Sequence, residues 1–251
     1  MSTRIELIRN LLKGIETGDP DAVNVISPEQ YIQHNPQTQT GREGLAALFA
    51  RLSKTNPRVN IVRAFEDGDY VFGHTEYDFD SRRVGFEVFR FEGEFVVEHW
   101  DNIQLRQGPN ASGHSMVDGE TLVVDLTATE LNRALVASYL DVVWIQERHG
   151  QLAEYVSDTD YIEHHPGGHD GVTALKEFLV AAHEDAIVYS RVHRLLAQGN
   201  FVLAVTEGLR DGEQTAFYDL FRVHAGAIVE HWNTTEAVAP KDEWQHNNGK
   251  F

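Results

Sequence analysis

The sequence predicts an α+β protein that contains two copies of one domain. Four short motifs recur in the same order, with 127–132 residues between the copies. In each half, helical periodicity is followed by four stretches that alternate like β-strands. The period is far too long for a solenoid, so we expect two separate domains rather than stacked repeats.

The repeat is clearest near the end of each half. Residues 86–102 (FEVFRFEGEFVVEHWDN) and 218–234 (YDLFRVHAGAIVEHWNT) are identical at six of 17 positions. Three upstream pairs keep the same order: YIQHNP (31–36) with YIEHHP (161–166), GREGL (41–45) with GHDGV (168–172), and DGDYVFGHTE (67–76) with QGNFVLAVTE (198–207). Four motif pairs in register indicate a duplication.

In the first half the helices come first. Residues 3–17 place apolar side chains on one helical face, Gly18 ends that helix, and Asp19 before Pro20 caps a short one. A third helix is expected at 42–54. Four strands then form an antiparallel meander at about 58–66, 69–79, 82–91 and 95–104.

The second half repeats this order. Thr127 and Glu130 predict a capping box that opens a helix to about residue 148. Another helix is expected at 171–183, and strands near 187–197, 200–210, 214–224 and 227–236. About 120 residues per unit suit a cone-shaped, strongly curved sheet with helices across its concave side. Such a cone encloses a mostly apolar pocket for a small ligand.

The domains are expected at 1–108 and 127–240, joined by a linker at 109–126. Within the linker, MVDGETLVV has an Asp-Gly pair between apolar residues, which predicts a short hairpin. The C-terminal WQHNNGKF is expected to be a frayed polar tail.

Composition excludes several classes of function. Among 251 residues, 21 Lys and Arg stand against 39 Asp and Glu, and the net charge of −18 disfavours nucleic acid and anionic membrane as partners. The absence of cysteine excludes disulfides, thiolate metal sites and cysteine nucleophiles. Without a signal peptide or an apolar run of 18 residues, a cytoplasmic location is expected.

The motifs Y-I-x-H-x-P, G-x-x-G and [FY]-[ED]-[VL]-F-R followed by V-E-H-W resemble the SnoaL-like branch of the nuclear transport factor 2-like superfamily. The resemblance covers both halves and implies two cystatin-like, cone-shaped α+β barrels. Its members include polyketide cyclases that perform an intramolecular aldol condensation, isomerases, dehydratases, epoxide hydrolases and non-catalytic binders. It implies no cofactor. Because members pair through the open sheet face, it also implies a pseudo-dimer within one chain, and a homodimer is left open.

A base that removes a proton beside a carbonyl and a donor to the enolate oxygen would suffice for such chemistry. Asp219 lies mid-strand on the same face as Phe217 and Phe221, where a solvated carboxylate is unfavourable. It is our first catalytic candidate, and an outward Asp219 paired with Arg222 is the alternative. Glu87 holds the matching place in the first half, although the family usually has Asp there.

Three histidines are further catalytic candidates. His34 and His164 occupy the same place in the two Y-I-x-H-x-P motifs and are expected to act as acid, base or oxyanion donor. Capping of a loop is the alternative. His74 is expected on a strand at the level of the pocket, where the second half has Val205, so a working His74 would make the two pockets unequal.

Strand alternation separates the residues of the V-E-H-W motif into two sets, and the sequence does not show which set lines the cone. Glu98 and Trp100 share one face, with His99 and Asp101 on the other, and the second half repeats this pattern. Packing in the core is the alternative to ligand binding for the aromatic residues. The candidate substrate-binding residues are Trp100, Trp232, Tyr31, Tyr161, Glu98 and Glu230.

A metal site is not expected from the sequence. His164, His165 and His169 cluster, but adjacent side chains diverge, and a site needs about three converging ligands. The leading prediction is a cofactor-independent cyclase, isomerase or lyase acting on a small hydrophobic carbonyl compound. The alternatives are a non-catalytic small-molecule-binding protein and a structural protein with filled cones. A cavity of about 300 Å³ with a carboxylate and a histidine would favour the enzyme.

Overall fold

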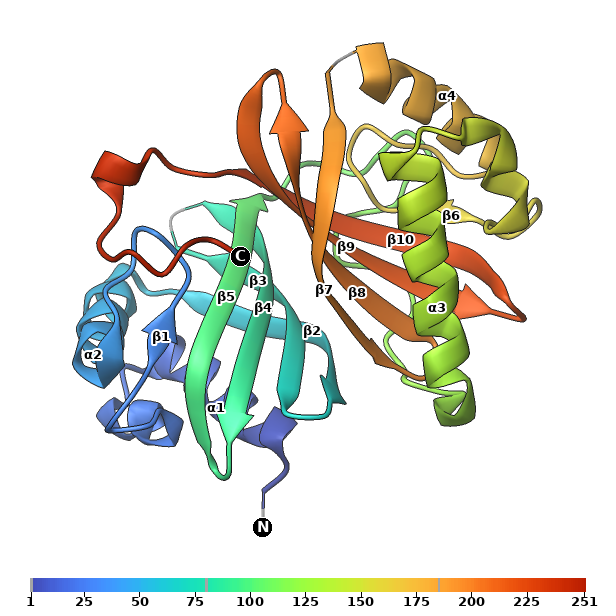
Figure 1. Ribbon diagram of the computed structural model, residues 1–251. Helices are drawn as coiled ribbons and strands as arrows, with labels where there is room; N and C mark the ends of the chain where they lie inside the picture. The colour runs from blue at the N-terminus through green and yellow to red at the C-terminus, as the bar shows by residue number, and fades with distance from the viewer. Residues whose placement is uncertain (1, 80, 185) are drawn as a thin grey trace. The chain divides into compact units, whose positions relative to one another are not determined.

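The computed structural model describes residues 2–79, 81–184 and 186–251, without the side chains of residues 183 and 184. The chain forms two compact units, Met1–Leu105 with Ala239–Phe251 (unit 1) and Arg106–Val238 (unit 2). Each unit packs helices against a five-stranded sheet, which confirms the duplicated α+β fold (Figure 1). No helix in the described ranges has the length and apolar character to cross a bilayer. Mutual packing of the two sheets stays a prediction.

The sheet of unit 1 has the order β1-β5-β4-β3-β2. Its four long strands form an antiparallel meander, and the short β1 pairs with β5 in parallel. The predicted long strands agree with the observed ones to within one residue at each end. The strands are β1 (Ile32–Gln33), β2 (Arg58–Asp67), β3 (Tyr70–Asp78), β4 (Arg82–Glu92) and β5 (Phe95–Leu105).

The helices of unit 1 cover one face of this sheet, which we call the inner face. α1 (Arg4–Thr17) begins with a capping box between Thr3 and Glu6, and Asp19 caps the 3-10 helix η1 (Pro20–Val25) as predicted. α2 (Gly41–Leu52) and the 3-10 turn η2 (Ser53–Thr55) follow. Apolar side chains of α1 and α2 pack with Val71 and Phe89 of the sheet in one core.

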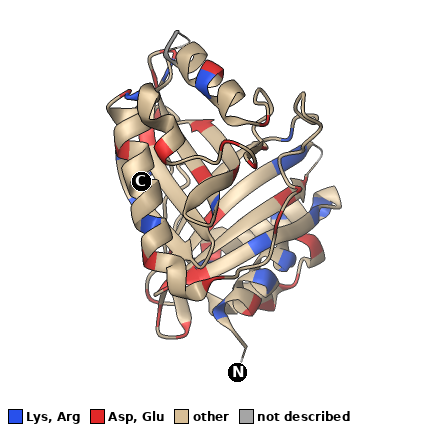
Figure 2. Cartoon of the chain, turned by 90° about the vertical axis from the view of Figure 1, so that its right-hand side faces the viewer, with Lys and Arg blue, Asp and Glu red and all other residues tan. Residues whose placement is uncertain are grey.

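Unit 2 repeats the arrangement, with the sheet order β6-β10-β9-β8-β7. Its strands are β6 (Ile162–Glu163), β7 (Val188–Gln198), β8 (Phe201–Arg210), β9 (Glu213–His224) and β10 (Ala227–Ala237). Its helical elements are η3 (Leu126–Ala128), α3 (Thr129–Tyr139), η4 (Leu140–Ile145), η5 (His149–Glu154) and α4 (Val172–Glu184). Acidic and basic residues are interleaved along the elements (Figure 2).

The start and length of the first helix in unit 2 differ from the prediction. α3 begins at Thr129, and Glu130 pairs with Arg133 rather than completing a capping box with Thr127. The Thr129 hydroxyl donates to the Leu126 carbonyl of the preceding 3-10 turn instead. The α-helical part ends at Tyr139 and is followed by one π turn, η4. The π turn interrupts the 3.6-residue periodicity on which the predicted helix was based.

Two segments pack on a unit in a way that the sequence did not indicate. Residues 106–125 (the linker segment) lie along unit 2 without the predicted hairpin, because their backbone bonds to unit 2: Val124 N–H donates to Asn200 Oδ1 and Glu120 N–H to Glu230 Oε1. Residues 239–251 (the C-terminal segment) belong to unit 1, where Lys250 is only 2% exposed. The prediction of a frayed tail was therefore wrong.

The two segments make matching contacts. Asn248 Nδ2 donates to the carbonyl of Gln33 at 3.0 Å, and Asn110 Nδ2 donates to the carbonyl of Glu163 at 2.6 Å. Gln33 and Glu163 occupy the same place in the repeat, immediately before the histidine of the Y-I-x-H-x-P motif. The duplication therefore extends to the segments that follow each sheet.

Gly119 lets the linker segment approach the outer face of the unit 2 sheet, away from the helices. Its φ is +89°, and an added Cβ would lie 2.1 Å from Glu230 Oε1 and 2.7 Å from Trp232. We expect Gly119→Ala to lower the free energy of unfolding by about 2–4 kcal/mol, from backbone strain and overpacking. Gly113→Ala is the control, because its φ is +92° and its Cβ would meet nothing within 4 Å. Urea denaturation measures both; equal losses would contradict the packing argument.

Candidate functional site

Unit 2 buries a chain of carboxylate, imidazole and carboxylate on the inner face of its sheet. His231 of β10 has Nε2 3.0 Å from Asp219 Oδ1 on β9 and Nδ1 2.9 Å from Glu163 Oε1 on β6. Strand pairing places them together, because His231 is registered beside Glu163 and Asp219 lies on the neighbouring strand. All three side chains are buried. We call these residues the unit 2 triad.

The triad contains one cation between two anions. Burial alone would lower the pKa of His231, but the charge of Glu163 and the hydrogen bonds to Asp219 and Glu163 outweigh it and raise that pKa to about 10. Burial likewise opposes ionisation of Glu163, yet His231, Tyr161 and backbone N–H groups lower the pKa of Glu163 to about 2. At neutral pH His231 is therefore an imidazolium that donates to a carboxylate from each ring nitrogen.

Two tyrosines complete the hydrogen bonds of the triad. Tyr161 donates its hydroxyl to Glu163 Oε2 at 2.5 Å, and Tyr189 of β7 donates to Asp219 Oδ2 at 3.0 Å. Burial, and then the neighbouring carboxylates, raise the pKa of both phenols well above 10. The phenols therefore remain protonated donors that fix the orientation of the two acids.

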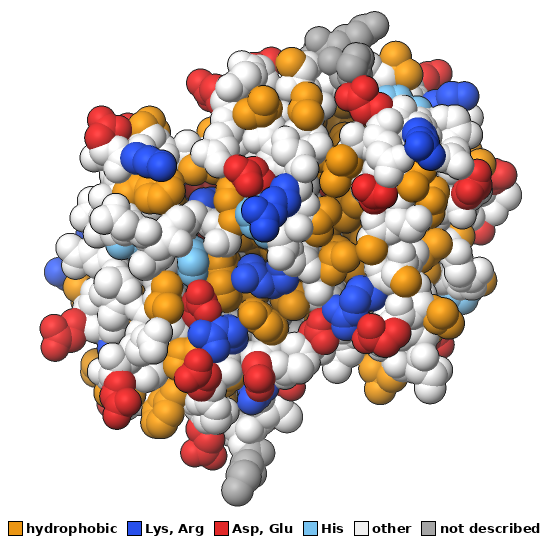
Figure 3. Space-filling view, viewed as in Figure 1, with side chains coloured by type: hydrophobic (Ala, Val, Ile, Leu, Met, Phe, Trp, Pro, Cys, Tyr) orange, Lys and Arg blue, Asp and Glu red, His pale blue; other side chains and the backbone are white. Residues whose placement is uncertain are grey.

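A pocket opens on the triad from the helical side of unit 2. Glu163, His231 and Tyr189 line it, whereas Asp219 lies behind them, and Trp144, Phe178 and Phe217 are among its apolar walls. Its cavity measures about 30 Å³, room for about one water molecule and well below the 300 Å³ typical of a ligand pocket. Hydrophobic side chains gather in a hollow between β7 and the helices α3 and α4 (Figure 3).

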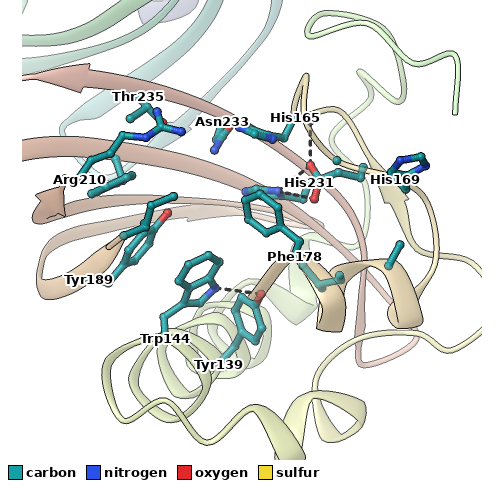
Figure 4. Close-up of a pocket in the computed structure, with 16 residues that line it drawn as sticks. Tyr139, Trp144, His165, His169, Phe178, Tyr189, Arg210, His231, Asn233 and Thr235 are labelled. Atoms are coloured by element: carbon teal, nitrogen blue, oxygen red, sulfur yellow. Dashed lines mark hydrogen bonds and ion pairs between the residues drawn. The ribbon is translucent and has the colours of Figure 1, made fainter. Parts of the chain in front are cut away.

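Hydrogen-bond donors also face this pocket. The hydroxyl of Tyr139 accepts from Trp144 Nε1 at 3.0 Å, which leaves its own hydrogen to donate (Figure 4). Burial raises the pKa of Tyr139 well above its usual range, against a smaller lowering by the hydrogen bond from Trp144. Burial lowers the pKa of His165, and its Nδ1 accepts from Gly167 N–H, so the neutral ring carries its proton on Nε2.

The rim of the pocket is polar. Figure 4 shows Arg210, Asn233 and Thr235 on one side and His169 on the other. Asn233 Oδ1 is buried and accepts no hydrogen bond within the described part of the chain. In the repeat, Arg210 corresponds to Phe79 of unit 1, so the cationic rim is a property of unit 2.

Unit 1 contains a related chain with its charges rearranged. His99 has Nε2 2.8 Å from Glu87 Oε2 and Nδ1 3.0 Å from Gln33 Oε1, so a neutral amide stands where unit 2 has Glu163. The second acid of unit 1 is Asp101, at the place of Asn233. An acid and an amide have thus exchanged places between the units.

The tyrosine that binds the central acid has moved between strands. In unit 1, Tyr77 of β3 donates to Glu87 Oε1 at 2.7 Å and pairs across the sheet with Val59. At the places of this pair, unit 2 has Gly208 on β8 and Tyr189 on β7. A Cβ on Gly208 would lie 2.0 Å from the Val188 carbonyl oxygen and 3.0 Å from Phe217, so this position accepts no tyrosine. Unit 2 therefore keeps a tyrosine hydroxyl that donates to the central acid, because Tyr189 takes the place of Tyr77.

The predicted catalytic histidines lie on the outer face of the sheets. His34 Nε2 is 2.9 Å from Glu98 Oε1, and its ring stacks on Trp100. His164 makes the same contacts with Glu230 and Trp232. Among the described contacts, the structure brings each of these histidines together with its predicted Glu and Trp, but not with Asp219 or Glu87.

The remaining predicted residues are divided between the faces. His74 is buried on the outer face, with its Nδ1 2.6 Å from Arg63 Nη1 and its ring against Phe86. Tyr31 and Tyr161 are buried on the inner side, where Tyr31 stacks on His99 and Tyr161 binds Glu163. A catalytic role for His74 and a substrate-binding role for Tyr31 and Tyr161 stay predictions.

Sequence reasoning missed Glu163, His231, Tyr139, Trp144 and Arg210 as pocket residues. One signal was available for Glu163: it directly precedes His164 in the Y-I-x-H-x-P motif and differs from Gln33 at the same place of the first copy. For Tyr139 and Trp144, the π turn η4 sets their mutual position, and helical periodicity does not reveal such a turn.

Two groups of side chains have the composition of metal ligands. Glu87, His99 and Asp101 form one inside unit 1, where the ammonium of Lys250 lies 3.6 Å from Asp101 Oδ1. The other, in unit 2, consists of His114, Asp118 and His164. In each group, one ligand atom per residue lies within 4.8 Å of the others.

Comparisons with known proteins concern the fold. Residues 8–99 match the family of SnoaL-like domains, and no curated protein matches the chain. A SnoaL-like polyketide cyclase from Agrobacterium tumefaciens is 13% identical over 42% of this chain and 91% of that one, with a TM-score of 0.36. A cystatin-like protein of unknown function from Xanthomonas campestris is 25% identical over 45% and 93%, with a TM-score of 0.37. An LEH-like epoxide hydrolase from M. tuberculosis is 17% identical over 43% and 84%, with a TM-score of 0.36.

Proposed function

Since residues 8–99 belong to the SnoaL-like domain family and unit 2 repeats the fold, we propose that the protein binds a small carbonyl compound in the unit 2 pocket and catalyses acid–base chemistry on it without a cofactor. The observation that carries this proposal is the unit 2 triad at the wall of a pocket that also receives the hydroxyl of Tyr139. The reaction class is enolisation, which underlies both isomerisation and aldol ring closure.

Tyr139 and His165 supply the donors for the carbonyl oxygen. Burial raises the pKa of the Tyr139 phenol, so it stays protonated, and the hydrogen bond that its oxygen accepts from Trp144 N–H strengthens its own O–H as a donor. The Nε2–H of neutral His165 is a second donor. In a pocket that excludes water, one such donor contributes about 10²–10³-fold to the stabilisation of a developing oxyanion.

The unit 2 triad supplies the group that takes the proton. With one imidazolium and two carboxylates its net charge is −1, so uptake of one proton makes it neutral. Its proton affinity belongs to the three coupled groups together. Because the pKa of Glu163 lies near 2, the triad is a weak base in its resting arrangement, and the oxyanion donors must provide much of the catalysis.

The pocket favours an apolar molecule that carries oxygen acceptors. Its walls include Trp144, Phe178 and Phe217, while Arg210 provides a cation at the rim. An arginine fork matches a carboxylate group. The proposed substrate class is therefore a hydrophobic carbonyl compound with a carboxylate at the end nearest the rim.

A second candidate function is binding without catalysis, and one observation favours it: a carboxylate with a pKa near 2 removes carbon-bound protons poorly. The cavity of about 30 Å³ must widen for either function. A binding protein would use the same donors and the same apolar walls.

Exchange of α-protons for deuterium separates the two functions. We expect the protein in D₂O to accelerate α-exchange in an aryl ketone acid, followed by NMR. Asp219→Asn should abolish exchange while leaving binding in place, and Tyr139→Phe should slow it about 10²-fold. Tyr77→Phe in unit 1 is the matched control and should leave the rate unchanged. Binding without any exchange would favour the binding protein, and full activity in Asp219→Asn would remove Asp219 from the mechanism.

A further inference from the structure

The linker segment brings two metal-ligating side chains to His164 on unit 2. His164 Nδ1 lies 2.7 Å from Asp118 Oδ1, and one ligand atom of His114 lies within 4.8 Å of both. We propose that His114, Asp118 and His164 bind one first-row divalent metal ion, with Zn²⁺ as the best fit. Two imidazole nitrogens and one carboxylate oxygen match the ligands that Zn²⁺ takes in proteins. Hard cations such as Ca²⁺ and Mg²⁺ prefer a full set of oxygens.

The second shell of this site is an independent observation. A metal-binding histidine usually donates its other ring N–H to a carboxylate or carbonyl. Here both histidines have such a partner: His164 Nε2 is 2.9 Å from Glu230 Oε1, and His114 Nε2 is 3.0 Å from Asp170 Oδ2. These contacts hold each ring by one nitrogen. His164 Nδ1 faces Asp118 Oδ1 and also lies 2.8 Å from the carbonyl oxygen of Ser115, so a bound ion would replace that hydrogen bond.

Burial and charge also suit an ion. The side chain of His164 is fully buried and provides a fixed ligand, whereas those of His114 and Asp118 are 30% and 47% exposed and provide an entry path. A tetrahedral ion with bonds of about 2.0 Å separates its ligand atoms by about 3.3 Å. The gap between His164 and Asp118 must therefore widen by about 0.6 Å, which the exposed Asp118 permits.

Unit 1 provides an internal comparison. His34 has the same two kinds of partner as His164: its Nε2 is 2.9 Å from Glu98 Oε1, and its Nδ1 is 3.0 Å from the carbonyl oxygen of Gly249, as His164 Nδ1 is 2.8 Å from that of Ser115. The C-terminal segment continues there with Lys250, a cation, instead of an aspartate and a histidine. We therefore place one ion per chain, in unit 2. It lies on the outer face, away from the inner-face triad, and fastens the linker segment to the sheet.

Metal binding by the full-length protein tests this proposal. After removal of bound ions with EDTA and dialysis, Zn²⁺ is titrated by calorimetry and Co²⁺ by its visible absorption. We expect one equivalent of Zn²⁺ to bind with a dissociation constant in the micromolar range or below, and Co²⁺ to give the intense bands of a tetrahedral site. His114→Gln and Asp118→Asn should each weaken Zn²⁺ binding by 10-fold or more.

The controls separate this site from adventitious binding by the 13 histidines. His193→Gln removes a partly buried histidine that pairs with Glu207 and should leave the Zn²⁺ affinity unchanged. Both ligand variants change partly exposed residues, and circular dichroism verifies that they are folded. The proposal is overturned if no saturable equivalent binds, if the double variant His114→Gln/Asp118→Asn keeps the parental affinity, or if the Co²⁺ spectrum is that of the hydrated ion.

Discussion

We expect His231→Leu to lower the free energy of unfolding by about 3–5 kcal/mol. The substitution removes the imidazolium but leaves two carboxylates, Asp219 at 2% and Glu163 at 5% exposure, without their shared cation. One carboxylate must then take up a proton or draw water into the core, and either change costs free energy. Urea denaturation at pH 7, followed by circular dichroism, measures the loss.

The same substitution at a partly exposed ion pair is the control. His193 Nε2 lies 2.9 Å from Glu207 Oε2, with 18% and 29% of the side chains exposed. His193→Leu should change the free energy of unfolding by less than about 1 kcal/mol, because solvent screens the pair and can hydrate the remaining carboxylate. A loss as large as that of His231→Leu would show that burial of the triad is not the cause.

The pH profile of stability identifies the charge responsible. The pKa of His231 is raised from 6.5 to about 10 on folding, so its contribution is complete below pH 6.5 and is lost as the pH rises through 10. That loss amounts to at most about 5 kcal/mol. The pKa of Glu163 is lowered from 4.5 to about 2, so its contribution is present above pH 4.5 and is lost as the pH falls through 2. Both shifts report one attraction and are not added. His231→Leu should lack the alkaline fall.

The strands could be predicted because their signals are local. Alternation of apolar residues and short turns fixed every long strand of unit 1 to within one residue, and the repeat transferred the pattern to unit 2. The face of each side chain follows from alternation, but which face meets the helices does not. This ambiguity left open which residues of the V-E-H-W motifs line the cone. His34 and His164 were chosen for their place in the Y-I-x-H-x-P motifs, and both lie on the outer face with Glu98 and Glu230.

The candidate site could be predicted in part, and its limits have physical reasons. Asp219 and Glu87 were identified because a carboxylate in an apolar strand is unfavourable in the absence of a partner. The partner is the inward-facing histidine of each V-E-H-W motif, His231 or His99. Unit 1 has the amide Gln33 and the acid Asp101, whereas unit 2 has the acid Glu163 and the amide Asn233 at the same places. The two repeats therefore differ at both positions, yet each unit keeps two acids beside one imidazole.

The linker and C-terminal segments could not be predicted, because single hydrogen bonds at long sequence separation hold them in place. Asn248 reaches Gln33 across 215 residues, and Asn110 reaches Glu163 across 53. Neither segment has the periodicity of a helix or a strand. Turn and polar residues such as those of WQHNNGKF are typical of frayed ends, and burial of Lys250 depends on the hydrogen bond that its ammonium donates to the Asp101 carbonyl oxygen.

Truncation after Val238 is therefore expected to destabilise unit 1 by about 2–4 kcal/mol. The deletion removes five contacts that residues 245–250 make with the rest of unit 1: Gln245 N–H to the carbonyl of Pro36, His246 to the carbonyl of Asn35, Asn248 to Gln33, Gly249 to His34, and Lys250 to Asp101. Each contact contributes about 1 kcal/mol net. The truncated protein no longer has to order the tail, and this entropic gain offsets part of the loss. Amide exchange at β1 and β5 should accelerate about 30- to 1,000-fold.

Two single substitutions test whether the matching contacts stabilise the two units equally. Asn248→Ala removes the bond to Gln33, and Asn110→Ala removes the bond to Glu163, so each should cost its own unit about 1–2 kcal/mol. Amide exchange reports the units separately: Asn248→Ala should accelerate exchange at β1 and β5, and Asn110→Ala at β6 and β10. The amide of His34 donates to the His99 carbonyl at 2.9 Å and reports on the pairing of β1 with β5. If its protection is unchanged in both Asn248→Ala and the truncated protein, the C-terminal segment contacts unit 1 without stabilising it.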